Sequence, residues 1–286
     1  MANLKEIRNR ISSVSSTMQI TSAMKMVSAA KLKKAQDAIT AMRPYANKLT
    51  ELLQGLSGTL DADVGSKYSN QRQVKNILIV PITSNRGLAG AFNSNIIKET
   101  NKLVSQMGPN QSVTYLVVGK KANDAFKKTN KVISDKSDIY DNLTFDNVAN
   151  IAEILMNKFT DEHVDKIILV YNKFKNAATQ EIMTEQFLPI IPITGSSIEA
   201  VDYIFEPSKV KIIEQLIPKS LKTQLFKAIR DSFASEHGAR MTAMHKATDN
   251  ATELRDQLKL TYNKARQAAI TNEILEIVGG AEALNN

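Results

Sequence analysis

The sequence contains no cysteine and no tryptophan, and only 11 of its 286 residues are glycine and 7 are proline. The absence of cysteine excludes a disulfide framework, thiolate chemistry and a cysteine-bound metal, and it fits a reducing compartment. So little glycine and proline excludes a low-complexity or disordered chain. The longest apolar runs, at 77–82 and 167–171, are far shorter than a membrane span. Because a helical pattern begins at Leu4, no signal peptide is expected.

The N-terminal segment carries the most informative pattern, a seam of positions spaced three and four residues apart. Thirteen of its sixteen residues are apolar, whereas the overall composition would supply about seven. Such a seam predicts one long helix in a coiled coil, roughly 80 Å long at 1.5 Å per residue. The seam consists of Leu4, Ile7, Ile11, Val14, Met18, Thr21, Lys25, Ser28, Leu32, Ala35, Ile39, Met42, Ala46, Leu49, Leu53 and Leu56.

Three polar residues, Thr21, Lys25 and Ser28, interrupt this seam. The apolar residues that lie beside them are Ala23, Met24, Met26, Val27, Ala29 and Ala30. This sideways step is either a stutter of the coiled coil or a contact surface for a second protein, and the two interpretations are compatible. Pro44 lies inside the same pattern, where a kink is expected rather than the end of the helix.

A different pattern begins after the break at 58–65. Buried strands are expected at 74–83, 113–119 and 166–173, and helices at 91–107, 120–129 and 148–159. Edge strands are expected at 180–187 and 203–205. This alternation predicts an α/β domain with a largely parallel sheet.

Helical spacing returns beyond Pro207, and Pro218 is expected in the first turn of a second long helix. Apolar residues recur there at heptad-compatible positions: Phe233, Met244, Ala247, Ala251, Leu254, Leu258, Ala265, Ala268 and Leu275. Because the α/β domain is inserted between the two helices, they are expected to pair as an antiparallel hairpin. The predicted parts are a first helix at 1–57, the α/β domain at 74–205 and a last helix at 208–286.

Positive charge is unevenly distributed along the chain, whose formal net charge is +8. Residues 1–60 hold nine Lys and Arg against three Asp and Glu, a net +6, and residues 208–286 hold twelve against nine. A basic helix is able to bind nucleic acid, but these charges are spread out and no aromatic residue precedes Tyr45. Solvated helix faces and acidic protein partners fit the distribution better.

The sequence offers little sign of catalytic chemistry. The loop 84–90 follows the first predicted strand, where α/β proteins bind phosphate, but it lacks a full dinucleotide or P-loop motif. A tight turn packed on its helix is the better interpretation. His237 and His245 are eight residues apart on a helix, which is wrong for a metal pair, and with His163 they are expected at the surface. We therefore predict no catalytic residue, no metal site and no cofactor.

The C-terminal tip carries apolar side chains around most of the helix circumference: Ala268, Ala269, Ile270, Ile274, Leu275, Ile277 and Val278. A two-helix hairpin does not cover such a surface. A partner protein that encloses the tip is favoured over packing within the chain. The last basic residue, Arg266, stands just before it.

Four segments resemble a known family. Residues 20–32 (ITSAMKMVSAAKL) are similar to the N-terminal signature of the γ subunit of rotary F-type ATP synthases. Residues 240–251 (RMTAMHKATDNA) and 262–271 (YNKARQAAIT) are similar to its C-terminal signature, and Gly87, Leu88, Gly90 and Asn93 to its central loop. Ala89 departs from the pattern, since relatives often carry cysteine there.

The resemblance implies a fold and a function. The implied fold is a long antiparallel two-helix coiled coil formed by both termini, with an inserted Rossmann-like α/β domain. The implied function is that of a central-stalk rotor, without catalytic activity of its own, which couples ion flow through a membrane c ring to conformational cycling of catalytic β subunits. Two alternatives remain: a basic coiled-coil adaptor that binds nucleic acid, and a free-standing nucleotide-dependent enzyme.

The resemblance also implies partners and contact residues. The partners are three α and three β subunits, the ε subunit, a δ-containing assembly and the c ring, at the cytoplasmic face of the bacterial cell membrane. The residues expected to contact α and β are Met24, Lys25, Val27, Lys31, Arg266, Gln267, Ile270, Ile274 and Leu275. Those expected near the c ring and ε are Asp202, Tyr203 and Glu206.

Overall fold

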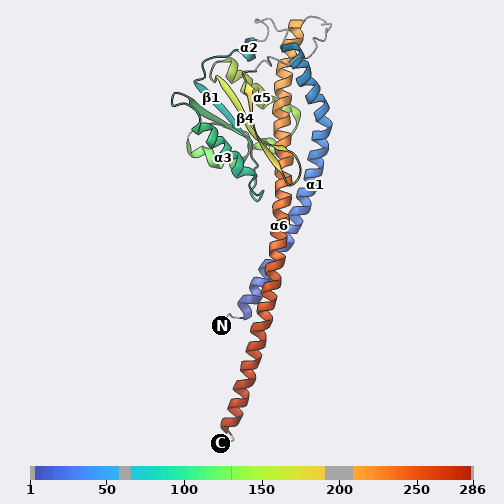
Figure 1. Ribbon diagram of the computed structural model, residues 1–286, viewed down its shortest axis with the longest axis vertical. Coiled ribbons are helices and arrows are strands. Elements are labelled where there is room, and N and C mark those ends of the chain that lie inside the picture. The colour runs from blue at the N-terminus through green and yellow to red at the C-terminus, as the bar shows by residue number, and fades with distance from the viewer. Residues whose placement is uncertain (1–3, 58–65, 130, 191–208, 285–286) are drawn as a thin grey trace. The chain divides into compact units, whose positions relative to one another are not determined.

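The computed structural model describes residues 4–57, 66–129, 131–190 and 209–284 (Figure 1). The chain divides into two compact units, one formed by 1–28 with 241–286 and the other by 29–240. Two long helices, α1 (Leu4–Ser57) and α6 (Lys209–Leu284), each contribute to both units. The fold is thus a mixed α/β structure with long N- and C-terminal helices. The three-part division at 57, 74, 205 and 208 stays a prediction.

Both long helices contain a proline in their interior. Helix α1 continues through Pro44, as expected, whereas α6 begins at Lys209, so the placement of Pro218 in a first turn was wrong. A proline inside a helix leaves the carbonyl four residues earlier without its usual donor. Those carbonyls belong to Thr40 and Glu214, both of which are exposed, so that water can take the place of the missing donor.

The unit formed by 29–240 is built on a five-stranded sheet with the order β3-β2-β1-β4-β5. The first four strands in chain order pair in parallel, and β5 is antiparallel to β4. Their bounds are β1 Asn76–Pro81, β2 Ser112–Val117, β3 Val132–Asp135, β4 Lys166–Phe174 and β5 Gln180–Leu188. The expected strands are confirmed, β3 was missed, and the strand expected at 203–205 lies outside the described residues.

Shorter helices precede the first strand and connect the strands that follow. They are α2 Ser66–Ser69, α3 Phe92–Ser105, α4 Lys120–Phe126 and α5 Phe145–Thr160, with 3-10 turns η1 Lys127–Thr129 and η2 Ser137–Tyr140. The helices expected at 91–107, 120–129 and 148–159 are therefore present within a few residues of their predicted ends. Thr144 begins α5 because its hydroxyl accepts a hydrogen bond from the Asn147 N–H at 3.4 Å.

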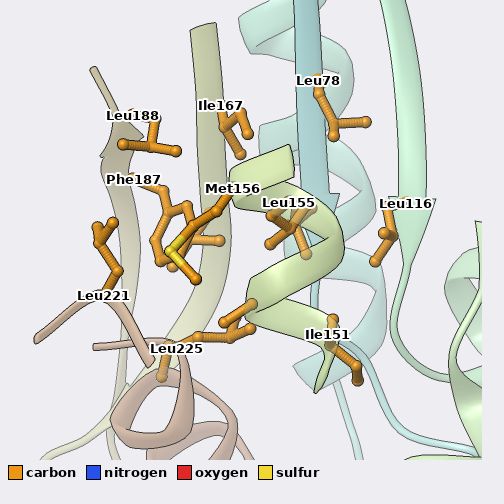
Figure 2. Close-up of a cluster of buried hydrophobic side chains, with 14 of the residues drawn as sticks. Leu78, Leu116, Ile151, Leu155, Met156, Ile167, Phe187, Leu188, Leu221 and Leu225 are labelled. Carbon is orange, nitrogen blue, oxygen red and sulfur yellow. The ribbon is translucent and has the colours of Figure 1, made fainter. Parts of the chain in front are cut away.

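Alternate residues of the central strands enter two different cores, as the pleat of a sheet requires. Leu78 faces α5 and α6, and its neighbour Ile79 faces α3 and α4. Figure 2 shows the first of these cores, in which side chains from the strands, α5 and α6 meet. Helix α6 supplies Leu221 and Leu225 to it, so the segment of α6 beside the sheet belongs to the core of this unit.

In the other unit, residues 8–21 of α1 contact residues 248–262 of α6. The contacts are Thr21 Oγ1 to Thr248 Oγ1 at 2.8 Å, Arg255 Nη1 to Met18 Sδ at 3.4 Å, and Arg8 Nη2 to Tyr262 Oη at 2.8 Å. Partners later in α6 meet residues earlier in α1, so these segments run in opposite directions. Leu254, expected on the contact face, is instead exposed, because Arg255 and Thr248 occupy that face.

Candidate functional site

The loop 84–90 lies at the carboxyl end of β1, next to the point where the strand order reverses between β1 and β4. A doubly wound sheet binds ligands in the crevice at this point. Here the Ser84 N–H donates to Asn93 Oδ1 at 2.9 Å, and Ser84 Oγ donates to the Arg86 carbonyl at 2.6 Å. Leu88 and Gly90 have left-handed φ angles of 61° and 56°. The predicted tight turn on its own helix is confirmed.

Helix α6 packs against the loop 84–90 at this end of the sheet. Arg240 Nη2 donates to the carbonyls of Arg86 and Gly87 at 3.2 and 3.3 Å. Ala239 packs against Ala89 and Phe92, which closes the apolar side of the same loop. The carbonyls of Arg86 and Gly87 in this loop thus already accept hydrogen bonds from Arg240 of the same chain.

Four ionisable side chains are buried on one short stretch of α6. Burial raises the pKa of Asp231 and that of Glu236, although nearby cations, Arg43 for Asp231 and Arg240 for Glu236, act in the opposite direction. Arg240 Nη1 lies 2.5 Å from Glu236 Oε1, and both residues are 7% exposed. Such a pair contributes little net stability, but breaking it leaves a buried charge without a partner.

His237 lies in the same stretch and is 5% exposed, so its expected place at the surface was wrong. Its ring meets Phe233 edge-on at 4.5 Å between centroids, and neither ring nitrogen has a hydrogen-bond partner among the described residues. Burial, with Arg240 and Lys31 nearby, lowers the pKa of His237 to about 4. His245 and His163 are exposed, as predicted.

Neither a metal cluster nor a membrane-spanning helix is found in the part of the chain that the structure describes. Across 4–57, 66–129, 131–190 and 209–284, His, Asp and Glu side chains nowhere gather in threes around a possible metal position. Over the same ranges, no helix is both long and apolar enough to cross a membrane.

The sideways step on α1 leaves apolar surface exposed. Val27 is 57% exposed, Met24 and Lys25 are half-buried, and Lys31 is exposed. Other exposed large apolar side chains on this stretch are Ile20 and Met26. The polar seam residues Thr21 and Ser28 are buried instead, so the contact face of α1 keeps its heptad spacing through the interruption.

The end of α6 is exposed on every side. All described side chains from Arg266 to Ala281 are exposed, including Gln267. The large apolar ones are Ile270, Ile274, Leu275, Ile277 and Val278, each between 48% and 67% exposed. Asp202, Tyr203 and Glu206 lie outside the described residues.

Comparison with known proteins assigns the chain to a family. The family model described as ATP synthase matches residues 3–284. The chain belongs to this family. It is 70% identical over 285 residues to the ATP synthase gamma chain of Flavobacterium psychrophilum, covering 99% of both chains, and 71% identical over 286 residues to that of Flavobacterium johnsoniae, covering all of both. The γ resemblance is confirmed, and neither alternative is supported.

Solved structures agree with this assignment. The chain matches a structure of the Tetrahymena thermophila mitochondrial ATP synthase central stalk and c ring with a TM-score of 0.59 and 26% identity, over 80% of this chain and 99% of that one. A Euglena gracilis mitochondrial ATP synthase structure has the same fold, with a TM-score of 0.69 at 22% identity, over 98% and 94%. A γ chain is a non-catalytic subunit of its complex.

Sequence reasoning missed the burial and the long-range hydrogen bonds of the stretch 231–240 of α6. Arg240 appeared only as part of a motif, and Glu236 was not singled out. The available signal was the spacing itself, because Glu and Arg four residues apart on a helix form an ion pair. The carbonyl partners of Arg240 lie about 150 residues earlier in the chain, where no local pattern identifies them.

Proposed function

We propose that this chain is the rotor of the central stalk, which couples ion flow through a membrane c ring to conformational cycling of catalytic β subunits. The observation that carries the proposal is the apolar end of α6, which is exposed on all sides. Large exposed apolar patches normally mark interaction surfaces. A shaft that turns inside a sleeve of other subunits requires such a surface. The exposed apolar side chains Ile270, Ile274 and Leu275 carry no charge that would bind them to one fixed partner position.

The proposed shaft is an antiparallel coiled coil of α1 and α6. The opposite running directions of the two helices within their common unit support it, as does the heptad spacing of buried residues such as Ile7 and Thr21. In this proposal the helices occupy 1–57 and 208–286, and the α/β insert occupies 74–205 with a Rossmann-like topology.

The proposed contacts with α and β subunits fall into two groups. On α1 they are Met24, Lys25, Val27 and Lys31, where apolar surface lies beside basic charge and would meet acidic loops of β. On α6, Arg266 and Gln267 supply polar contacts at the border of the apolar end formed by Ile270, Ile274 and Leu275.

Asp202, Tyr203 and Glu206 are proposed to contact the c ring and the ε subunit. The complex would also contain a δ-containing assembly. The proposed location is the cytoplasmic face of a bacterial cell membrane, where the chain would be held through these partners. The Flavobacterium relatives and the c-ring structure support this arrangement.

The experiment that tests this function replaces Arg266 and Gln267 together by alanine in a verified, fully assembled complex. Charge-assisted hydrogen bonds are worth about 1.5 to 3 kcal/mol each, so their loss from a rate-limiting rotary step should slow ATP turnover tenfold or more. Melting of the separate full-length chain should barely change, because both side chains are exposed and alanine favours helix. Lys259→Ala, at another exposed position of α6, is the control. Wild-type turnover in the double variant would contradict these contacts.

A further inference from the structure

The stretch 231–240 of α6 is buried on all sides except at Phe233, which is half-buried. A helix that is buried all round is normally apolar. Here the buried residues include Asp231, Ser235, Glu236 and Arg240. Burying such groups costs free energy unless they are hydrogen-bonded, so the partners of these side chains indicate what the stretch does.

Two of these side chains hold backbone carbonyls of the insert. Arg240, fixed by Glu236, donates to the carbonyls of Arg86 and Gly87 beyond β1. Ser235 Oγ donates to the Asn172 carbonyl of β4 at 3.0 Å. The carboxyl-terminal part of the sheet is therefore attached to α6 by directional polar contacts at two adjacent strands.

Another close contact lies on the same stretch of α6. A Cβ built at Gly238 would come within 3.2 Å of the Ala177 carbonyl oxygen, so a larger residue there would require the segment after β4 to move by a few tenths of an ångström. Closer to the start of α6, the contacts are those of the apolar core, for example at Leu221 and Leu225. Apolar contacts are non-directional, whereas hydrogen bonds weaken steeply when their angle or length changes.

We propose that Glu236, Arg240 and Ser235 form a torque joint, a set of positioning residues that prevents the insert from twisting relative to α6. The proposal rests on the proposed rotor function. Torque that acts on the insert passes through these contacts into α6, which continues without a break to Leu284. Twisting at the joint would lengthen the hydrogen bonds from Arg240 to the two carbonyls and leave a buried guanidinium unsatisfied. The joint therefore resists rotation of the insert relative to α6.

The test uses Glu236→Gln with Arg240→Gln, which removes both charges and leaves polar side chains; Gln has the shape of Glu and is smaller than Arg. Each variant is assembled into complexes in membrane vesicles, and ions pumped per ATP hydrolysed are measured against increasing opposing gradients. Lys222→Gln is the matched control, because Lys222 also links α6 to the insert, through Glu153 on α5, but at the surface. Arg240→Lys keeps the charge pair with Glu236 without the planar fork that reaches two carbonyls.

The expected result is a pumping ratio that falls at least twofold under the highest gradient in the double variant, less in Arg240→Lys and not in Lys222→Gln. Amide hydrogen exchange of the full-length chain should also accelerate at 84–93 in the double variant alone. The proposed joint would be refuted if the double variant pumped as many ions per ATP as wild type at every gradient, or if its ratio were lowered equally with and without a gradient. If the double variant does not assemble, Ser235→Ala, which removes only one hydrogen bond, is tested by the same criteria. A wild-type complex without coupled pumping would instead refute the rotor function.

Discussion

Replacing His237 with leucine should change how the stability of the chain depends on pH. His237 is buried against Phe233, and its pKa is about 4 in the folded chain against an ordinary 6.5. Burial is the main cause, and Arg240 and Lys31 add to it. Between these two pKa values the unfolded chain binds a proton that the folded chain does not, so stability rises with pH across this window and is lost as pH falls from 6.5 to 4.

The size of the effect follows from the shift. At pH 5 the difference in proton binding removes about 2 kcal/mol of unfolding free energy relative to pH 8, and about 3 kcal/mol is lost once pH is below 4. Asp231 and Glu236 act in the opposite direction, because their pKa values are raised by folding and their contribution improves as pH falls. The wild-type curve alone therefore mixes both effects, and the difference between variant and wild type separates them.

The assay is urea unfolding of the full-length chain, followed by circular dichroism at pH 8, 6 and 5. His237→Leu should gain about 2 kcal/mol relative to wild type between pH 8 and pH 5, whatever its stability at pH 8. His163→Leu, at an exposed position, is the control and should follow the wild-type curve. If His237→Leu runs parallel to wild type over this range, the histidine is not held neutral by its surroundings and the argument fails.

Two further predictions concern backbone and pairing. Gly119→Ala should lower the unfolding free energy by about 3 to 5 kcal/mol, because φ is +104° there and a Cβ would lie 2.2 Å from the Thr83 carbonyl oxygen. Gly108→Ala is the control, since its Cβ would meet open space, and it should change the unfolding free energy by less than about 0.5 kcal/mol in the same urea titration. A double-mutant cycle of Thr21→Val and Thr248→Val should give a coupling of about 0.5 to 1.5 kcal/mol, and zero coupling would mean that the 2.8 Å hydroxyl contact does not form.

Sequence periodicity was most informative where one face of an element is buried. Every described seam residue of α1 up to Leu49 is buried or half-buried, including polar Thr21 and Ser28. The strands β1, β2 and β4 were predictable because both of their faces are covered, which produces continuous apolar runs. The edge strand β3 was missed because only Val132 and Ser134 are partly covered, and four residues give no distinctive pattern.

The exposed apolar end of α6 was predictable from the sequence, because apolar residues around a whole helix are incompatible with a two-helix hairpin. The contact residues themselves stay predictions, and Arg266 and Gln267 rest on the family resemblance. The torque joint was not predictable, because its acceptors are backbone carbonyls, which every residue type possesses. His237 was misplaced for a related reason: a single histidine carries no signal of burial until the loops that cover it are known. Long-range packing decides these positions, and helical spacing does not report it.

Helix α6 reverses the usual distribution of polar and apolar side chains at two places, and the two reversals require different explanations. At Glu236 and Arg240 charges are buried, which is tolerable because Arg240 donates to Glu236 and to two carbonyls of the insert. At Ile274 and Leu275 apolar side chains face solvent, and every square ångström left exposed forgoes about 25 cal/mol of burial. The first reversal is completed inside the chain and fixes the insert to the helix. At the second, no described residue covers Ile274 and Leu275, and in the proposed rotor the surrounding subunits would cover them.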